Sequence, residues 1–325
     1  MLTTVVGSYP SFSRLPLSIM EKISNYMGSY DAYKSALEIA VQDQVKAGVN
    51  LISDGQVRGN MLEVFAKEIP GMITTDGKPI IIGKIQPAPY SIGASEIKVA
   101  LKTAKKLSSD FKNDLQILYR NKFQDNFKGI KAIITGPTTL ALSSRIEGFY
   151  NKDEKDKAII DIAGALKKEA EYLQNAGAAV IQIDEPFLST GIADLKTANK
   201  AIGIIVSDLL QPTSIHVCGP ISEVLDDLLR FKVSIIDCEF ADQNKNLEAL
   251  ENINLKGKKI GLGCIDTKTN TVETKEQVAS IIEKGMELVG KENLIADPDC
   301  GMRLRSREAA YSKLKVMVET VKWLS

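Results

Sequence analysis

Short runs of β-branched and other apolar residues alternate along the chain with longer amphipathic segments rich in alanine, leucine, lysine and glutamate. Nearly continuous apolar runs bounded by turn residues are typical of parallel strands that are buried on both faces. The pattern predicts eight strands, which are Thr3–Gly7, Val49–Asp54, Lys131–Thr135, Ala179–Asp184, Thr213–Cys218, Val233–Cys238, Lys259–Cys264 and Asn293–Ala296.

Segments with helical periodicity follow most of these strands. The clearest are Lys155–Ala176, Ala193–Leu210, Ile221–Phe231, Lys275–Val289 and Arg307–Leu324. A regular alternation of eight strands with helices is the rhythm of a (β/α)8 TIM barrel, an α/β fold in which the strands form a closed parallel sheet. We therefore predict this barrel.

The segment from about residue 71 to residue 127 breaks the repeat, between the second and third strands. Its first part, Lys78–Tyr90, is punctuated by proline and glycine, and helix-like sequence follows. We interpret the segment as an insertion, with a hairpin and helices over the mouth of the barrel. No linker or low-complexity stretch divides the chain, so residues 1–325 are expected to form a single domain.

Composition excludes several classes of function. The chain has 325 residues, of which 44% are hydrophobic, and its 41 basic residues balance its 41 acidic ones. A zero net charge without a basic stripe argues against binding to nucleic acid or to an anionic membrane. The apolar runs are far shorter than the roughly 20 residues that span a bilayer, and the N-terminus lacks the features of a secretory signal. We therefore expect a cytoplasmic protein.

Polar and thiol side chains gather where the predicted strands end. The residues at or just beyond these ends are Ser8, Asp54, Gly136, Asp184, Cys218, Glu239, Asp266 and Cys300, and all but the glycine carry a polar or thiol group. Catalytic residues of such barrels lie at the carboxyl ends of the strands. We therefore expect an active site at this rim.

A metal site is the most specific chemistry that the rim predicts. His216 is the only histidine in the chain, and Cys218 lies two residues further on, so both side chains point to the same face of an extended strand. Taken alone, this pair fits a buried thiol beside a hydrogen-bonded histidine equally well. Because Glu239 and Cys300 also lie at strand ends, the sequence favours Zn²⁺ held by imidazole, thiolates and a carboxylate.

The other two cysteines could compete as ligands, but packing roles are expected for them, more clearly for Cys238 than for Cys264. Cys238 precedes Glu239 and should face the helices, and Cys264 ends a strand near the rim. Two thiolates and a carboxylate would give the zinc site a formal charge of −1. Such a site suits the binding of an electron-rich substrate thiolate better than the activation of water. A structural zinc remains an alternative, although such sites usually contain C-x-x-C pairs, which this chain lacks.

Ordered motifs through most of the chain resemble the catalytic C-terminal barrel of the cobalamin-independent methionine synthase family. They are T-T-V-V-G-S-Y-P at 3–10, D-G-Q-V-R at 54–58, I-T-G-P-T-T-L at 134–140, I-Q-I-D-E-P at 181–186, H-V-C at 216–218, C-E-F at 238–240 and D-P-D-C-G at 297–301. The chain is similar to the short, core-only form typical of archaea. The resemblance implies zinc bound by His216, Cys218, Glu239 and Cys300, and synthesis of L-methionine from L-homocysteine.

The resemblance also implies where homocysteine binds. Val6, Gly7 and Ser8 match the turn whose backbone N–H groups would suit the substrate carboxylate. Asp184 matches one of the two acidic groups that hold the amino group. The second acidic group falls at Gln56, which can still accept a hydrogen bond from an ammonium group but without the contribution of a negative charge.

The part of the family site that handles the methyl donor is altered in this chain. Leu142 or Ser143 stands where many members have a tryptophan that stacks on folate. The loop after the seventh strand lacks the family's histidine and carries Asp266 and Lys268, which are candidates for the donor side. The resemblance therefore implies a donor that is either a methylated folate or pterin, or a methylcorrinoid, free or bound to a partner protein.

Two other functions stay open at this point. One is a zinc methyltransferase that acts on a different thiol, as in the related corrinoid–coenzyme M group. Asp184 discriminates against it, because only an amino-acid substrate needs an anionic partner for its ammonium group. The other is a non-catalytic zinc protein that serves in binding or assembly.

Overall fold

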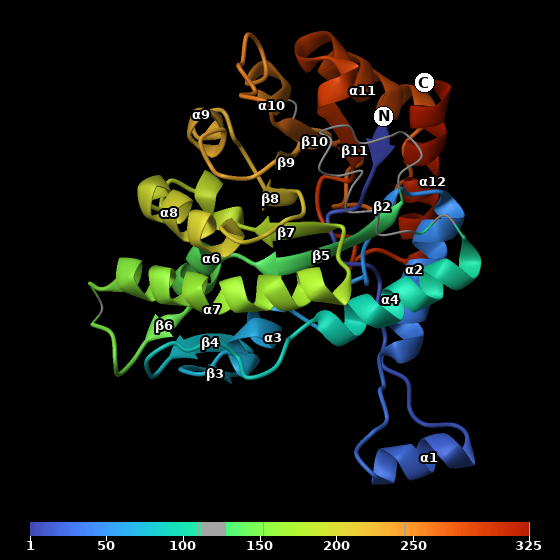
Figure 1. Cartoon of the computed structure of the whole chain (residues 1–325). Coiled ribbons are helices and arrows are strands. Elements are labelled where there is room, and N and C mark those ends of the chain that lie inside the picture. The colour runs from blue at the N-terminus through green and yellow to red at the C-terminus, as the bar shows by residue number, and fades with distance from the viewer. Residues whose placement is uncertain (110, 112–127, 152, 244, 325) are drawn as a thin grey trace.

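The predicted barrel is confirmed in a computed structural model, which describes residues 1–324 except 110, 112–127, 152 and 244. Eight parallel strands lie in the order β1-β11-β10-β9-β8-β7-β5-β2, and helices surround them (Figure 1). The strands are β1 (Leu2–Thr3), β2 (Leu51–Ile52), β5 (Gly129–Thr135), β7 (Val180–Asp184), β8 (Thr213–Val217), β9 (Ile235–Glu239), β10 (Lys259–Gly263) and β11 (Leu294–Asp297).

The barrel closes through a short contact between β1 and β2. A parallel bridge joins Thr4 to Leu51, and the Thr4 hydroxyl donates to the Leu51 carbonyl over 2.9 Å. Both strands have only two residues and are shorter than predicted. Beyond them, side chains replace the strand pairing, since the Ser53 hydroxyl donates to the carbonyl of Gly7 over 2.6 Å. The chain therefore turns early into the rim loops.

The helices are α1 (Ile19–Tyr26), α2 (Lys34–Ala47), α3 (Met61–Glu68), α4 (Ala94–Leu107), α6 (Pro137–Ser143), α7 (Lys155–Ala176), α8 (Leu195–Val206), α9 (Leu225–Leu228), α10 (Lys245–Glu248), α11 (Lys275–Val289) and α12 (Arg307–Trp323), with 3-10 turns η1 (Pro186–Ser189) and η2 (Lys291–Asn293). The predicted bounds of α7 and α11 are confirmed. Helix α9 is shorter than predicted, and turns flank it, since the carbonyl of Ile221 accepts from the N–H of Val224 over 3.0 Å and the carbonyl of Leu228 accepts from the N–H of Phe231 over 3.0 Å. Among the described residues, no helix has the length and apolar character needed to cross a membrane.

The insertion lies between the second and third barrel strands, as predicted. Strands β3 (Met72–Thr75) and β4 (Lys78–Ile81) form an antiparallel hairpin around Asp76 and Gly77, which both have positive φ. Strand β4 also pairs in parallel with β6 (Arg145–Ile146), and the hairpin contacts α3 and α6. The hairpin is therefore held against α3, α6 and β6, and none of its residues lines the open cleft at the rim. The expectation that the insertion covers the mouth stays a prediction. Most of residues 110–127 lies outside the described part of the chain.

An arm that the sequence pattern did not predict projects from the rim. It carries α1, which begins at a capping box on Ser18 and stands away from the barrel in Figure 1. Arg14 pairs with Glu21 inside the arm, and Arg58 pairs with Asp31 at its base over 2.7 Å. The arm exposes large apolar side chains, which are Phe12, Leu15, Leu17, Ile19, Met20, Ile23, Tyr26 and Met27.

A buried carboxylate joins two of the sequence motifs. Glu185 accepts hydrogen bonds from the backbone N–H groups of Thr138 and Thr139, over 2.9 and 2.8 Å, at the start of α6. Gly136 is needed beside it, because a Cβ there would lie 2.1 Å from the Glu185 carboxyl carbon. Burial raises the pKa of Glu185 to about 7, although these hydrogen bonds oppose the shift. The interaction fixes the rim ends of β5 and β7 relative to each other.

Candidate metal and substrate site

An open cleft of about 690 Å³ lies at the rim formed by the carboxyl ends of the strands. It brings together most of the site residues predicted from the sequence, which are Val6, Ser8, Gln56, Asp184, His216, Cys218, Glu239, Lys268 and Cys300. Gly7 and Asp266 do not line it. The structure therefore brings these residues together at the strand ends, and their roles stay predictions.

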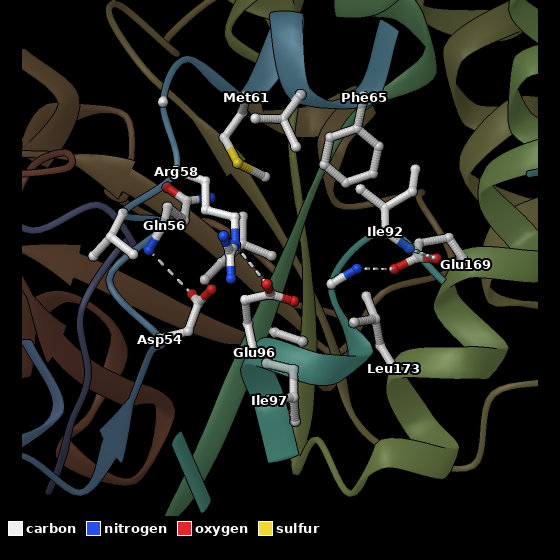
Figure 2. Close-up of a pocket in the computed structure, with 16 residues that line it drawn as sticks. Asp54, Gln56, Arg58, Met61, Phe65, Ile92, Glu96, Ile97, Glu169 and Leu173 are labelled. Carbon is white, nitrogen blue, oxygen red and sulfur yellow. Dashed lines mark hydrogen bonds and ion pairs between the residues drawn. The ribbon is translucent and has the colours of Figure 1, made fainter. Parts of the chain in front are cut away.

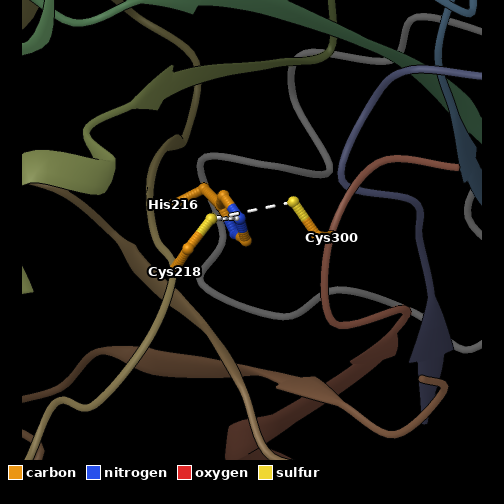
Figure 3. Close-up of side chains that lie close together, drawn as sticks. All are labelled: His216, Cys218 and Cys300. Atoms are coloured by element: carbon orange, nitrogen blue, oxygen red, sulfur yellow. Dashed lines mark hydrogen bonds between the residues drawn. The ribbon is translucent and has the colours of Figure 1, made fainter. Parts of the chain in front are cut away.

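Three metal-ligand side chains converge in this cleft (Figure 3). The donor atoms of His216, Cys218 and Cys300 all lie within 4.8 Å of one another. His216 Nε2 lies 3.0 Å from the Cys218 sulfur, which lies 3.7 Å from the Cys300 sulfur. His216 and Cys218 reach the site from the end of β8, whereas Cys300 comes from the loop after β11, so β/α barrel closure assembles the cluster from distant parts of the chain.

Asp237 orients the imidazole from inside the barrel. Its Oδ1 lies 2.9 Å from His216 Nδ1, and both residues are buried. Burial opposes a charged imidazole, but Cys218 and Asp237 raise the pKa of His216 well above its usual value. With Nδ1 held by the carboxylate, Nε2 faces the two sulfurs, which is the orientation that a metal-binding histidine needs. Sequence reasoning missed Asp237, although it shares the inward face of β9 with Glu239.

The two thiols have unequal acidity. A hydrogen bond from Cys218, together with the nearby His216, lowers the pKa of Cys300 to about 4 despite burial. The same hydrogen bond and burial raise the pKa of Cys218. Cys300 is therefore the more acidic of the two thiols. Two thiols of unequal acidity and an imidazole with a fixed orientation form a donor set that suits Zn²⁺.

Glu239 lies on the same cleft but outside this cluster of donor atoms. Its Oε2 accepts a hydrogen bond from the N–H of Gly219 over 3.0 Å, and burial raises its pKa. The side-chain amide of Asn246 donates to the carbonyls of both Gly219 and Glu239, over 3.0 and 2.7 Å. This amide ties the loop that follows Cys218 to the loop that follows Glu239. The role of Glu239 as a ligand stays a prediction.

Asp299 links the loop that carries Cys300 to the loop that follows β9. Its carboxylate accepts from the backbone N–H groups of Phe240, Ala241 and Asp242, over 2.8 to 3.0 Å. Burial raises the pKa of Asp299 to about 7, although these three donors oppose the shift. The P-D-C-G motif thus has a structural part as well as a candidate ligand.

The remaining cysteines are placed as the sequence predicted. Cys238 and Cys264 are both buried in the apolar core, and the Cys264 sulfur lies 3.4 Å from the carbonyl of Asp297. Burial raises the pKa of both thiols. Neither belongs to the cluster of candidate ligands among the described residues.

The turn after β1 forms one wall of the cleft. The carbonyl of Ser8 accepts from the N–H of Met302 over 2.7 Å, so the turn is fastened to the loop that carries Cys300. Gly301 is needed at this contact, because a Cβ there would lie 2.1 Å from the Ser8 hydroxyl oxygen. The carbonyl of Val6 faces inward and accepts from Gln182 over 2.8 Å.

Asp184 and Gln56 lie on the cleft but differ in environment. Burial raises the pKa of Asp184 to about 6, with His216 and Gln182 opposing the shift. Gln56 has a positive φ of 46° and a buried side-chain nitrogen without a hydrogen-bond partner. Its backbone is fixed because its N–H donates to Asp54 over 3.1 Å and its carbonyl accepts from Arg303 over 2.6 Å. Strained backbone of this kind is often found at ligand sites.

The two candidate donor-side residues behave differently. Lys268 lines the cleft and forms an ion pair with Asp242. Asp266 instead stabilises its own turn, since its carboxylate accepts from the N–H of Lys268 over 2.7 Å. The structure therefore places Lys268 on the cleft and Asp266 outside it.

A second, more enclosed cavity adjoins the cleft at Gln56 and Met61, between α3, α4 and α7 (Figure 2). Most of its lining is apolar. Its charged groups have partners, since Arg58 pairs with Glu96 over 2.5 Å, and Glu169 accepts from the N–H groups of Ile92 and Gly93 at the start of α4. This cavity therefore offers little chemistry of its own.

These features define a class of protein, a parallel β/α barrel with an imidazole and two thiols at its carboxyl rim. Comparisons with known proteins narrow that class. Residues 1–322 match the sequence profile described as the catalytic domain of the cobalamin-independent synthase. The chain is 50% identical over 318 residues to a methionine synthase of Methanothermobacter thermautotrophicus and 43% identical over 333 residues to that of Methanocaldococcus jannaschii. These alignments cover 98% and 99% of both chains, respectively.

The fold comparison agrees with the sequence comparison. A B12-independent methionine synthase from Shewanella sp. W3-18-1, solved in complex with selenomethionine, superimposes with a TM-score of 0.75. The alignment covers 99% of this chain and 97% of the other, at 21% sequence identity. The chain belongs to the cobalamin-independent methionine synthase family.

Proposed function

We propose that the protein transfers a methyl group to the thiol of L-homocysteine to form L-methionine, using Zn²⁺. The observation that carries this proposal is the meeting of His216, Cys218 and Cys300 in a cleft that also contains Asp184. His216, Cys218, Cys300 and Glu239 would hold the metal. Bound zinc would keep the substrate sulfur deprotonated and nucleophilic at neutral pH.

The other end of the cleft supplies groups for an amino acid. The Val6–Ser8 turn would receive the substrate carboxylate, and Asp184 would accept hydrogen bonds from its ammonium group. Gln56 would add an uncharged acceptor. Together these groups would hold homocysteine with its sulfur toward the ligand cluster, and such positioning contributes much of the rate of a displacement reaction.

The methyl donor would approach through the open side of the cleft. We propose a methylated folate or pterin, or a methylcorrinoid carried by a partner protein or free. The cleft lining, all within the described residues, contains no Phe, Tyr or Trp on which a pterin could stack. Its outer part instead carries Lys268, Arg303, Leu304 and Arg305. These cationic groups would suit the anionic groups of either class of donor.

A methyl-transfer assay tests the proposal. Purified zinc-loaded protein is given L-homocysteine with methylcobalamin, methyltetrahydrofolate or a methylated pterin, and methionine is measured. We expect methionine with at least one donor, and we expect Cys218→Ser and Cys300→Ser to lose both zinc and activity. Cys238→Ala is the matched control, because it removes a buried thiol that lies outside the cluster. Stoichiometric zinc in either serine variant would contradict the ligand set.

One observation supports a second candidate function. Gln56 offers an amide where a second anionic group would strengthen the binding of an ammonium group. A zinc methyltransferase of the corrinoid–coenzyme M type acts on a simpler thiol without an ammonium group. Such an enzyme would need an anionic group neither at Asp184 nor at the position of Gln56. The Asp184→Asn variant separates the two functions, because a homocysteine enzyme loses substrate affinity and an enzyme for a simple thiol does not. A non-catalytic zinc protein would show no methyl transfer with any thiol.

A further inference from the structure

A buried glutamine connects the groups proposed to bind the two ends of the amino acid. Gln182 lies on β7, and its side chain is fully buried inside the barrel. Its Nε2 donates to the carbonyl of Val6 and to Oδ1 of Asp184, over 2.8 Å in each case. One amide group therefore contacts both the turn proposed for the substrate carboxylate and the acid proposed for the ammonium group.

The orientation of this amide is fixed by chemistry. Its Oε1 accepts a hydrogen bond from the ammonium group of Lys131, which has only donors to offer. A flipped amide would place its N–H groups against that ammonium group and its oxygen against a carbonyl and a carboxylate. Both amide donors are thus used on Val6 and Asp184, and no other assignment satisfies the three neighbours.

The network extends to the ligand cluster. Lys131 Nζ lies 3.7 Å from Asp237 Oδ2, and the other oxygen of Asp237 holds His216. Lys131 and Asp237 are almost completely buried. Buried charges and amides lower stability unless they are well paired, and an apolar core would be simpler to build. A polar chain that runs from the amino-acid end of the cleft to the ligand histidine therefore suggests a role in the site.

We propose that Gln182 is a positioning residue that sets the distance between the Val6–Ser8 turn and Asp184, and thereby selects thiols that carry an α-amino acid group. The inference rests on the proposed function, because it assumes that homocysteine is the acceptor. Gln182 does not belong to the cluster of candidate ligands, which is His216, Cys218 and Cys300. Its effect acts through the two groups whose positions it fixes.

Binding measurements test this role without knowledge of the methyl donor. The protein is loaded with cobalt, and thiol binding is followed by the thiolate-to-cobalt charge-transfer absorption. The probes are L-homocysteine and 2-mercaptoethanol, which lacks both the ammonium and the carboxylate group. Zinc content per chain is measured separately for each variant.

Gln182→Met keeps the size of the side chain and removes all its hydrogen bonds. We expect the Kd for homocysteine to rise roughly ten- to hundredfold, because hydrogen bonds to charged groups are involved. The Kd for 2-mercaptoethanol and the zinc content should stay unchanged. Gln182→Glu is the second variant, since it keeps an acceptor for Lys131 but places a carboxylate beside Asp184. If Gln182→Met does not fold, Gln182→Glu provides the test. It should also raise the Kd for homocysteine and leave the Kd for 2-mercaptoethanol unchanged.

Gln211→Met is the matched control. Gln211 is also buried and donates to the carbonyl of Ala178, but it precedes β8 at the opposite end of the barrel. The Gln211→Met variant should change neither the Kd for homocysteine nor the Kd for 2-mercaptoethanol. An unchanged Kd for homocysteine in the Gln182 variants, an equal rise for both thiols, or loss of zinc would overturn the positioning role. If the wild-type protein binds 2-mercaptoethanol as tightly as homocysteine, the proposed acceptor itself is wrong, and this result is visible without any variant.

Discussion

Glu185 gives the protein a dependence of stability on pH that one substitution should remove. Its pKa in the folded chain is about 7, against an ordinary value of 4.5, because burial disfavours the charged form. The folded state thus binds the proton more tightly than the unfolded state. This stabilisation is fully present below about pH 4.5 and is lost as the pH rises through about 7. At roughly 1.4 kcal/mol per pH unit, the loss is about 3 kcal/mol.

The Glu185→Gln variant cannot ionise, and its amide oxygen can still accept from Thr138. Its amide nitrogen would face the N–H of Thr139, so one hydrogen bond is lost at about 1 kcal/mol. We therefore expect the variant to be less stable than the wild type at pH 5. It should be equally stable or more stable at pH 8, so that the two profiles cross.

Urea unfolding of the metal-free protein, followed by circular dichroism between pH 5 and pH 8, measures this difference. Metal is removed with a chelator so that its pH-dependent binding does not contribute. Other buried carboxyl groups with raised pKa values, such as Asp54 and Asp299, are present in both proteins and cancel in the comparison. Parallel stability profiles, with a difference that changes by less than about 1 kcal/mol across this range, would refute the reasoning.

Three further substitutions test the site. Gly301→Ala should raise the Kd for homocysteine at least about tenfold with zinc retained, because the new Cβ displaces Ser8. An unchanged Kd, measured by titration, would contradict this prediction. Asp237→Asn should weaken zinc binding about 10- to 100-fold in a chelator competition, since the carboxylate orients His216. A zinc affinity equal to that of the wild type would show that Asp237 does not orient the ligand. Lys131→Met should lower the free energy of unfolding by about 3 kcal/mol, because it removes the buried cation beside the Asp237 carboxylate and the donor to Gln182; wild-type stability in urea would show that the ion pair contributes little.

The ligand cluster could be predicted from the sequence because the geometry of strands follows simple rules. Residues two apart on a strand share a face, which placed His216 with Cys218 and turned Cys238 away from Glu239. Parallel strands in a barrel also bring their carboxyl ends to one rim. These two rules, together with the family motifs, predicted nine residues that now line one cleft.

The polar groups beneath the cleft were not predicted. Lys131, Gln182 and Asp237 lie inside otherwise apolar strands, where a periodicity argument counts them only as interruptions of a hydrophobic run. Their signal was available, since Gln182 shares its face of the strand with Asp184, and Asp237 shares its face with Glu239. Their partners, however, come from different strands, and only the closed sheet shows which groups meet.

The lengths of the first two strands and the presence of the projecting arm could not be predicted from the sequence either. Both strands end after two residues, and beyond them a bond from the Ser53 hydroxyl to the carbonyl of Gly7 joins the two segments. Such contacts join residues far apart in sequence. The position of the hairpin beside the barrel depends in the same way on its pairing with β6.

X-ray absorption at the zinc edge, with and without L-homocysteine, tests the central claim most directly. We predict a zinc shell with two sulfur neighbours from Cys218 and Cys300, and a third sulfur when homocysteine is added. The Cys238→Ala variant should behave like the wild type, because its thiol lies outside the cluster. A zinc shell that stays the same with saturating homocysteine would contradict thiol activation at the metal and indicate a structural ion.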